Sequence, residues 1–541
     1  TEIYTLSLHD ALPISWSPDS RWIAYTQPYT RAASRVVVYN LQTGEKQFVT
    51  DEWYDSSDPA FSPDGKYLYF TSSRDFRPIY SWTEWNHAYV DMQKVYLLPL
   101  LKNTPSPFTP KMDEPSPKPE GTAGGNKNEK KAESQGGVEV KIDFEGILTR
   151  SLALPGEGGN YWNLTPRENG IYYNRANSKE RKASLCYFDL ENQKENVLGD
   201  YGSFIISADG KKMMVSGQGK YFIIDTPKSK IQADESIDVS NMKVFTDLKK
   251  EWAQIFRESW RQMRDFFYDS GMHGVDWKAM YSKYEPLVKH VNNRNDLNYI
   301  IGEMIGELNV GHSYVGGGDK PQPERIKTGL LGARLSKDAS GYFRIDKILP
   351  GENWNPALRS PLSLPGMDIA EGDYILAING KSTQSVNDIY ELLVGMADKQ
   401  VEILTGKTPD PAAGRKLLIE PIADEAGLYY FQWVRGNIEK VNKATNGEVG
   451  YIHIPDMGVD GLNEFVKYFY PQLDKRALII DDRGNGGGNV SPMIIERLRR
   501  ELSTFSVQRN AGVTTRPGQM MYGPKVLLLD RYSASDGDLF P

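Results

Sequence analysis

The chain has 541 residues and a formal net charge of −7, so it is too long for one hydrophobic core and we expect several domains. No basic stripe lies outside one linker-like segment, which argues against nucleic acid as a partner. No apolar stretch approaches the roughly 20 residues that span a bilayer, so no membrane span is predicted. The single cysteine, Cys186, excludes an internal disulfide and a cysteine-based zinc site. Its strand-like surroundings predict a buried structural thiol.

Residues 1–14 do not fit a secretory signal peptide. They begin without Met and contain neither a charged first segment nor a small-residue cleavage site. They resemble translated sequencing-adapter sequence, so we expect them to be artefactual. An export signal, if the protein has one, is therefore not visible.

Three stretches share one pattern: an apolar residue, Ser-Pro or Ser-Ala, Asp-Gly or Asp-Ser, a basic residue and then alternating apolar positions. They are residues 15–26, 60–72 and 205–217. The Asp-Gly step suits a tight hairpin turn, and the alternation suits a half-buried strand. With a further strand pair at 161–176, the spacing is typical of propeller blades. We predict a partial β-propeller over residues 15–240, with a β-sandwich as the alternative.

Residues 103–137 are composed mainly of Pro, Gly, Lys, Glu and Ser. Such a segment has too little apolar surface to offset the entropy lost on ordering. We expect a disordered loop between two strands rather than a domain boundary.

A helical segment is predicted over residues 245–322. A first helix carries six large apolar residues at helical spacing and stops before Gly271, and a second covers residues 295–308. We expect the six to be core residues rather than a ligand site: Trp252, Phe256, Trp260, Met263, Phe266 and Phe267. A glycine-rich loop follows, and it carries His312 and Ser313.

Residues 326–422 resemble a PDZ domain. The match rests on a hairpin at 371–382, a flanking helix at 385–395 and a loop that resembles the carboxylate-binding loop of these domains. That loop contains Leu330, Leu331, Gly332 and Ala333. The resemblance implies that a peptide adds as a strand to the sheet edge beside this loop.

The last segment, residues 426–541, alternates strands and helices and is predicted to be an α/β domain. The expected strands and helices are 449–458, 461–475, 477–490, 491–503 and 525–530. The sequence Asp-Asp-Arg-Gly-Asn-Gly-Gly-Gly follows a strand and precedes a helix, so its amides can face an anion or a carbonyl oxygen. A phosphate loop is the alternative, although no Gly-Lys-Ser/Thr follows. The turn around Ser533 and Ser535 fits either an ordinary turn or a raised nucleophile.

The order of these segments resembles the tricorn protease family, in the wider clan of carboxy-terminal processing serine peptidases. The specific features are His312 in Gly-His-Ser-Tyr, the glycine-rich loop and Ser-Ala-Ser-Asp-Gly. The resemblance implies a multidomain fold. Its parts would be a partial β-propeller, a helical core piece, a PDZ-like domain and a crotonase-like or ClpP-like α/β peptidase core.

The resemblance implies a serine endopeptidase or oligopeptidase that cuts peptides or unfolded polypeptides without a cofactor. In this family the serine before Asp-Gly is the nucleophile, which here is Ser535 rather than Ser533. His312 would accept its proton, because such pairs are defined by geometry and not by sequence distance. Backbone amides of Gly487 and Asp536 would form the oxyanion hole, where each donor is worth roughly 10²–10³ in rate.

Supporting roles are expected for Gly486 and Gly488 in the glycine-rich loop and for Ser313. The family has a serine beside its histidine, and Ser313 follows the histidine here, whereas Gly311 precedes it. The family's orienting glutamate lies some tens of residues after the nucleophile. The sequence ends six residues after Ser535, so we expect a fragment truncated within its peptidase core.

Two other functions stay open. One is a Ser-Lys processing protease, whose lysine would lie beyond residue 541; His312 and the propeller argue against it. The other is a propeller–PDZ scaffold that binds peptides without cutting them. The intact serine, histidine and glycine loop argue against a scaffold for the complete protein.

The remaining histidines carry less signal. His273 is expected to be structural, and His453 alternates in a strand like an edge or core residue. No two histidines have metal-ligand spacing, so no metal is expected. The family resemblance implies a homo-oligomer, since the family forms hexamers, and a cytoplasmic location, with an exported protein as the alternative.

Overall fold

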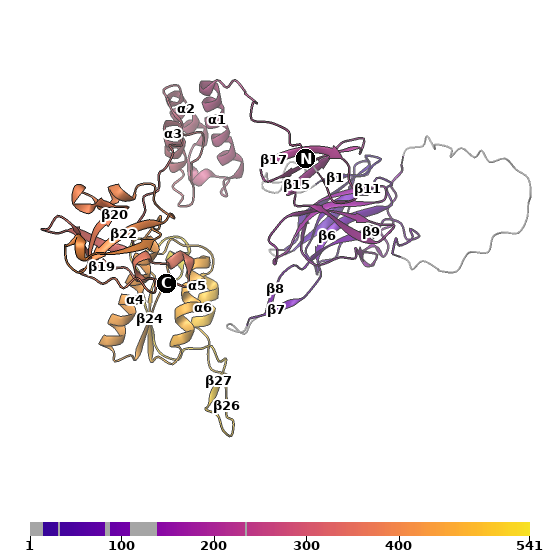
Figure 1. The fold of residues 1–541 in the computed structure, drawn as a ribbon. Coiled ribbons are helices and arrows are strands. Elements are labelled where there is room, and N and C mark those ends of the chain that lie inside the picture. Colours follow the sequence, from indigo (N-terminus) through magenta and orange to yellow (C-terminus); the bar gives the residue numbers. More distant parts are fainter. Residues whose placement is uncertain (1–13, 31–32, 82–86, 109–137, 233–234) are drawn as a thin grey trace, which may run out of the picture. The chain divides into compact units, whose positions relative to one another are not determined.

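The computed structural model describes residues 14–541 except 31–32, 82–86, 109–137 and 233–234. The chain divides into two compact units, residues 1–319 and 320–541, which are described one at a time (Figure 1). Residues 1–13 of the expected artefactual segment and residues 109–137 of the expected loop lie outside the described residues.

The first part of unit 1 forms four antiparallel sheets that follow one another along the chain (Figure 1). Their strands are β1 (Ser15–Trp16), β2 (Trp22–Pro28), β3 (Ser34–Asn40) and β4 (Lys46–Phe48); β5 (Ser56–Phe61), β6 (Tyr67–Ser73), β9 (Gln93–Pro99) and β10 (Leu152–Ala153); β11 (Asn160–Arg167), β12 (Gly170–Ala176), β13 (Ser184–Asp189) and β14 (Lys194–Gly199); and β15 (Ser203–Ile206), β16 (Lys212–Gly217) and β17 (Lys220–Asp225). A hairpin of β7 (Pro78–Tyr80) and β8 (His87–Tyr89) projects from the second sheet. Strands β9 and β10, on either side of residues 103–137, pair with each other.

Neighbouring sheets bury their facing sides against each other, as propeller blades do. Alternate residues of β12 show this, because successive side chains point to opposite faces of a strand. Tyr173 packs in a cluster with Leu97 of the second sheet, whereas Tyr172 packs with Phe204 of the fourth. Cys186 is fully buried in the first of these clusters, which confirms the predicted structural thiol.

The repeated Ser-x-Asp pattern forms the same turn in three sheets. In each copy the serine hydroxyl donates to the aspartate carboxylate at 2.6 Å, and the amide two residues after the aspartate donates to the same oxygen at 3.1 Å. The aspartates are Asp19, Asp64 and Asp209. The turn closes the hairpin by side-chain bonds to the backbone, which explains why the motif recurs in three of the four sheets.

Three helices complete unit 1: α1 (Leu248–Phe266), α2 (Trp277–Val288) and α3 (Arg294–Gly306). Asp247 begins α1 by accepting from the amides of Lys249 and Lys250, and Asn293 begins α3 with a capping box. The sequence analysis predicts α1 and α3 but not α2, which lies between them.

The predicted aromatic core of α1 is correct except at Phe266. Trp252 and Phe256 are buried, and Trp260, Met263 and Phe267 pack against the same cluster. Phe266 is 41% exposed, so its assignment to the core is wrong. Phe266 is the last residue of α1, and the chain then turns so that the extended Phe267, rather than Phe266, packs against the cluster.

Unit 2 begins with a PDZ-like sheet of six strands in the order β18-β19-β20-β22-β23, with β21 paired to β20. The strands are β18 (Ala333–Lys337), β19 (Phe343–Ile348), β20 (Tyr374–Ile378), β21 (Lys381–Ser382), β22 (Val401–Gly406) and β23 (Arg415–Ile419). The predicted hairpin is the β20–β21 pair. Asn379 and Gly380 form its turn with φ values of 46° and 76°, as an Asn-Gly hairpin turn requires. The flanking helix is a short 3₁₀ helix, Ile389–Leu393.

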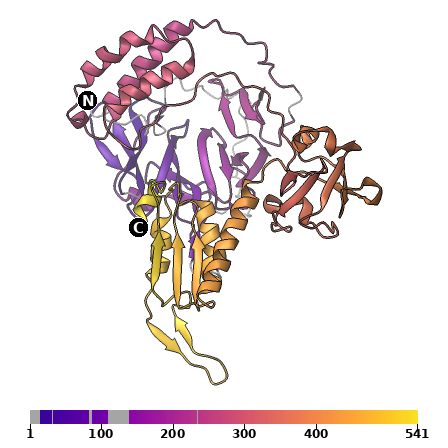
Figure 2. The ribbon, with the colours of Figure 1, turned by 90° about the vertical axis from the view of Figure 1, so that its left-hand side faces the viewer.

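The rest of unit 2 is an α/β domain with a three-stranded parallel sheet in the order β24-β25-β28. Helices cover both faces of the sheet (Figures 1 and 2). The elements are α4 (Ala426–Ala444), β24 (Val449–His453), α5 (Val459–Phe469), β25 (Ala477–Asp481), α6 (Ser491–Leu498), β28 (Lys525–Leu528) and α7 (Asp536–Leu539), with a hairpin of β26 (Thr504–Ser506) and β27 (Thr514–Arg516).

Strand β28 is less buried than its apolar sequence predicts. Val526 is 54% exposed, because β28 lies at the edge of the described sheet, whereas β25 has a partner on both sides. No helix in the described part of the chain is long and apolar enough to span a membrane.

Candidate active site

Ser535 lies in the turn between β28 and α7, and its backbone has φ 55° and ψ −124°. A residue other than glycine is strained at positive φ, and such strain persists only where the surroundings enforce it. A serine held on a strained strand-to-helix turn is a recognised way of presenting a nucleophile. Ser535 is half-buried.

Ser533, two residues earlier, has a different role. Its hydroxyl donates to the backbone carbonyl of Asp482 at 2.9 Å. This bond ties the serine turn to the end of β25. Ser533 is therefore used in holding the turn in place.

The glycine-rich loop after β25 packs directly on the serine turn. Gly487 has φ 88°, and a β-carbon there would lie 2.6 Å from the β-carbon of Ser535 and 3.0 Å from the amide nitrogen of Asp536. The structure thus brings together three of the predicted residues. Only glycine fits at 487, both for its φ and for this close approach.

Gly488 fixes the other side of the loop. A β-carbon there would lie 1.9 Å from the carbonyl oxygen of Met457, and the amide of Met457 donates to the carbonyl of Gly487 at 2.8 Å. The loop therefore lies between the segment after β24 and the serine turn. Gly486, by contrast, has open space where its β-carbon would be.

Asn485 organises the loop, and the sequence analysis missed it. Its side chain donates to the carbonyl of Ile454 at 3.1 Å and to Asp482 at 2.8 Å, and it accepts from the amide of Gly487 at 2.8 Å. Its own carbonyl accepts from the amide of Ala534 at 2.9 Å. An asparagine in a glycine-rich turn was the available signal, since its amide can bond several backbone groups at once. In this arrangement the Gly487 amide, a predicted oxyanion donor, is already paired.

The carboxylate of Asp536 is bonded to the start of α6. It accepts from the amide of Ser491 at 3.0 Å and from the Ser491 hydroxyl at 2.6 Å. A carboxylate at this place satisfies a donor that the helix cannot pair internally. As the first residue of α7, Asp536 has a backbone amide that its own helix leaves unbonded.

Two adjacent buried aspartates, Asp481 at the end of β25 and Asp482 just after it, have different environments. Burial raises the pKa of Asp481, but hydrogen bonds from Arg483 and Tyr451 outweigh it and lower the pKa below its usual value. Burial raises the pKa of Asp482 to about 7, with further contributions from nearby carboxylates. One oxygen of Asp482 is buried without a partner among the described residues.

His453 lies at the end of β24 and is buried. Its Nδ1 contacts the Tyr430 hydroxyl at 2.9 Å, and its Nε2 contacts the carbonyl of Arg483 at 3.2 Å. Burial lowers its pKa. Both ring nitrogens thus have partners in the domain core, which agrees with the predicted core position.

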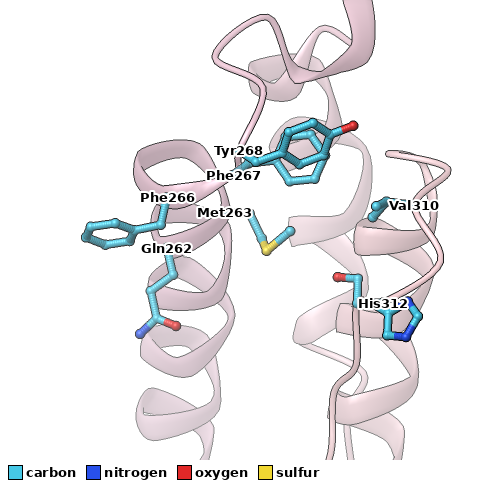
Figure 3. Close-up of a pocket in the computed structure, with 8 residues that line it drawn as sticks. Gln262, Met263, Phe266, Phe267, Tyr268, Val310 and His312 are labelled. Atoms are coloured by element: carbon cyan, nitrogen blue, oxygen red, sulfur yellow. The ribbon is translucent and has the colours of Figure 1, made fainter. Parts of the chain in front are cut away.

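His312 lies in unit 1, on the loop after α3. With Ser313 it lines a hollow of about 600 Å³, together with Gln262, Met263, Phe266, Phe267, Tyr268 and Val310 (Figure 3). Figure 3 shows Phe266 on the side of α1 that points away from Met263. Ser535 belongs to unit 2, and its pairing with His312 stays a prediction. His273 contacts the carbonyl of Leu308 at 2.8 Å through Nδ1, as a structural residue would.

The predicted carboxylate-binding loop of the PDZ-like domain lies at the start of β18. The amide of Gly332 donates to the carboxylate of Glu425 at 2.8 Å. Leu331 and Ala333 are buried, and Leu330 pairs with Ile422 through two backbone hydrogen bonds. The loop therefore contacts a carboxylate that belongs to the same chain.

Four family models match successive parts of the chain. They are the tricorn protease second beta propeller domain over residues 9–227, the tricorn protease C1 domain over 248–306, the tricorn protease PDZ domain over 329–424 and peptidase family S41 over 448–541. The fold and the site thus define a multidomain chain whose last part is a serine peptidase domain of family S41.

Relatives match along nearly the whole chain. Tricorn protease homolog 1 of Streptomyces coelicolor is 31% identical over 98% of this chain and 51% of its own length, and the tricorn protease of Thermoplasma acidophilum is 29% identical over 97% of this chain and 48% of its own. A crystal structure of the tricorn protease matches with a TM-score of 0.83 at 26% identity, over 97% of this chain and 51% of that one. The chain belongs to the tricorn protease family. It spans about half the length of these relatives.

Proposed function

We propose that the complete protein is a tricorn-type serine peptidase that hydrolyses peptide bonds in peptides or unfolded polypeptides. Ser535 is the nucleophile and His312 is the general base. The amides of Gly487 and Asp536 stabilise the negative charge that develops on the substrate carbonyl oxygen. The proposal is supported by the family S41 match over residues 448–541 and by the geometry around Ser535.

The reaction would proceed by acyl transfer. The Ser535 hydroxyl attacks the scissile carbonyl carbon while His312 takes its proton, and the carbonyl oxygen becomes an oxyanion. His312 then returns the proton to the leaving amine as the carbon–nitrogen bond breaks. Water, deprotonated by His312, releases the acyl group and restores Ser535.

The single observation that carries the proposal is the strained backbone of Ser535 against Gly487. Strain at a non-glycine residue is maintained only where the fold enforces it, and such strain clusters at functional sites. Here Gly487 lies against both the β-carbon of Ser535 and the amide nitrogen of Asp536. For the Gly487 amide to act as a donor, it must share or leave its bond to Asn485.

The test is a pair of serine variants in the complete protein. Ser535→Ala should lower kcat on a fluorogenic peptide by roughly 10⁴-fold or more, because the nucleophile is lost. Ser533→Ala is the matched control and should stay within about tenfold of wild type, since it loses only one neutral hydrogen bond. Full activity of Ser535→Ala would refute the assignment. It would leave a peptide-binding scaffold, or a peptidase with a different nucleophile, as the function.

Two wider properties belong to the same proposal. Following the family, we expect the complete protein to form a homo-oligomer and to act in the cytoplasm. Light scattering of the purified protein measures the first, and fractionation of the native cells measures the second.

A further inference from the structure

The hollow beside His312 in unit 1 has an apolar floor. Met263, Phe267 and Val310 line it, and all three also pack against the hydrophobic cluster formed by α1, α2 and α3. The core of the helical part is thus open on this side. In Figure 3 the Met263 side chain extends from α1 toward the side on which Val310 and His312 lie. At about 600 Å³ the hollow is within the size range of ligand pockets.

Tyr268 lines the same hollow and is held in place although it is 76% exposed. Its hydroxyl is hydrogen-bonded to Nε2 of His273, and Nδ1 of that ring contacts the carbonyl of Leu308 at 2.8 Å. The ring of Tyr268 also packs on that of Phe267, with centroids 4.9 Å apart. His273 therefore links the segment after α1 to the segment after α3. An exposed aromatic ring that is fixed in this way offers a contact surface at little entropic cost on binding.

The chemistry of the lining favours an uncharged occupant. The other lining residues are Gln262, Phe266 and Ser313. Among the described residues that line the hollow, none is acidic, and none except His312 is basic. A charged side chain placed here would lose water without gaining an opposite charge, whereas an apolar side chain would complete the packing of the open core.

The position of His312 indicates which part of a substrate comes to the hollow. In the proposed mechanism His312 returns a proton to the leaving amine, so the imidazole must lie within hydrogen-bond reach of that nitrogen. The acyl part of the substrate is held by Ser535 and by the amides of Gly487 and Asp536, all in unit 2. The side chain beside the leaving nitrogen is therefore the one that a hollow adjoining His312 receives.

We propose that this hollow is the subsite for the peptide residue directly after the scissile bond and that it selects a large apolar side chain there, which rests on the proposed function because His312 is taken as the general base. A Phe, Leu or Met side chain at this position packs onto Met263, Phe267 and Val310. The fixed ring of Tyr268 lies against its flank.

The test uses the complete protein and two series of fluorogenic peptides. In the first series only the residue after the scissile bond varies, among Phe, Leu, Ala, Glu and Lys. In the second series only the residue before the bond varies, among the same five. Mass spectrometry of the products identifies the bond that is cut. In the first series the kcat/KM of wild type should be at least about tenfold higher for Phe than for Glu or Lys, since one methylene in an apolar pocket already changes kcat/KM by roughly 10–200-fold.

A charged variant of the floor tests the same subsite directly. Met263→Lys places a positive charge in the hollow on a side chain of similar length. It should lower the Phe-to-Glu ratio of the first series by at least about tenfold and leave the second series unchanged. Met263→Leu should keep the wild-type preference. Tyr299→Lys is the control, because it changes an aromatic residue of α3 that is 70% exposed and does not line the hollow.

Three results would overturn the subsite. Equal kcat/KM of wild type for Phe and Glu in the first series would do so without any variant. An unchanged ratio in folded Met263→Lys would place the selection elsewhere, and a change confined to the second series would assign the hollow to the acyl side. In these cases, loss of hydrolysis in Ser535→Ala would show that the proposed function still stands. Hydrolysis that Ser535→Ala does not affect, or no hydrolysis at all, would refute both.

Discussion

At the scale of single residues, Asp482 is the charged group with the most unusual environment near Ser533 and Ser535. It is fully buried, bonds Asn485 through one oxygen and leaves the other unpartnered among the described residues. Burial raises its pKa to about 7, and Asp481, Asp530 and Asp536 add to the shift. At pH values between the ordinary aspartate pKa and about 7, the Asp482 carboxyl is protonated to a greater extent in the folded protein than in the unfolded chain.

The free energy of unfolding should therefore fall as the pH rises through this range. Asp482→Asn keeps the shape and removes the charge, so we expect it to flatten the pH dependence of unit 2 and to be more stable than wild type at pH 8. The gain in the free energy of unfolding at pH 8 is a few kcal/mol at most, since a shift of one pKa unit corresponds to about 1.4 kcal/mol. Urea unfolding at pH 5 and pH 8 measures it. Asp538→Asn, an exposed neighbour, is the control, and an unchanged pH slope in Asp482→Asn would contradict the prediction.

Asn485 is the residue through which the loop, the core and the serine turn are joined. Asn485→Ala removes three hydrogen bonds of the Asn485 side chain. The Gly487 amide and the Ile454 carbonyl each lose this partner, and so does the Asp482 carboxylate. We expect a loss of about 2 kcal/mol or more in stability, since each buried group left unpaired costs about 1–3 kcal/mol, together with a lower kcat. Thermal unfolding and peptide hydrolysis measure the two effects. The exposed Asn489→Ala should change neither, and wild-type behaviour of Asn485→Ala would refute the role.

At the scale of elements, the site is built at the carboxyl ends of adjacent parallel strands. β25 leads into the glycine-rich loop and β28 into the serine turn, and Met457, after β24, pairs with Gly488. Parallel strands bring their carboxyl ends to one edge of the sheet, which is where sites of α/β folds form. Segments more than 40 residues apart in sequence, around Gly487 and Ser535, are thereby placed in contact.

Two neighbouring glycines offer a direct test of this packing. Gly487→Ala should abolish peptide hydrolysis in the complete protein, because the new β-carbon would meet the backbone of residues 534–536 at a positive φ. Gly486→Ala should be tolerated, since the space around it is open and its φ is ordinary. Hydrolysis rates and binding of a serine-reactive phosphonate measure the effect. Equal loss in both variants would mean that the loop acts through general flexibility rather than through contact with the serine turn.

At the scale of the whole molecule, the proposed mechanism joins two units. His312 belongs to unit 1 and Ser535 to unit 2, so the proposed mechanism requires that the complete protein bring them together. In the complete protein, His312→Ala should reduce hydrolysis about as much as Ser535→Ala, because such pairs act as a unit. It should also slow phosphonate labelling of Ser535. The exposed His290→Ala is the control. Normal labelling and activity in His312→Ala would remove His312 from the mechanism.

The local structure of the chain was predictable from the sequence alone. Periodicity and turn residues predicted the blade hairpins, helices α1 and α3 and the alternation of the last domain, because each depends on neighbours a few residues apart. The hairpin at 371–382 was expected from the resemblance to PDZ domains. The quoted motifs likewise indicated the family. The exposure of Phe266 and of Val526 was not predicted, since it depends on where a helix stops and on which strands flank β28.

Only the tertiary structure decided which distant groups meet. Asn485 and Asp482 are ordinary turn and strand-end residues in the sequence, and their roles come from burial and from partners that the fold supplies. Glu425 gives no signal before the chain turns back to place its carboxylate on the amide of Gly332. Hydrogen bonds and desolvation act over a few ångströms in space, so a pattern along the chain predicts elements but not the contacts that these elements make with one another.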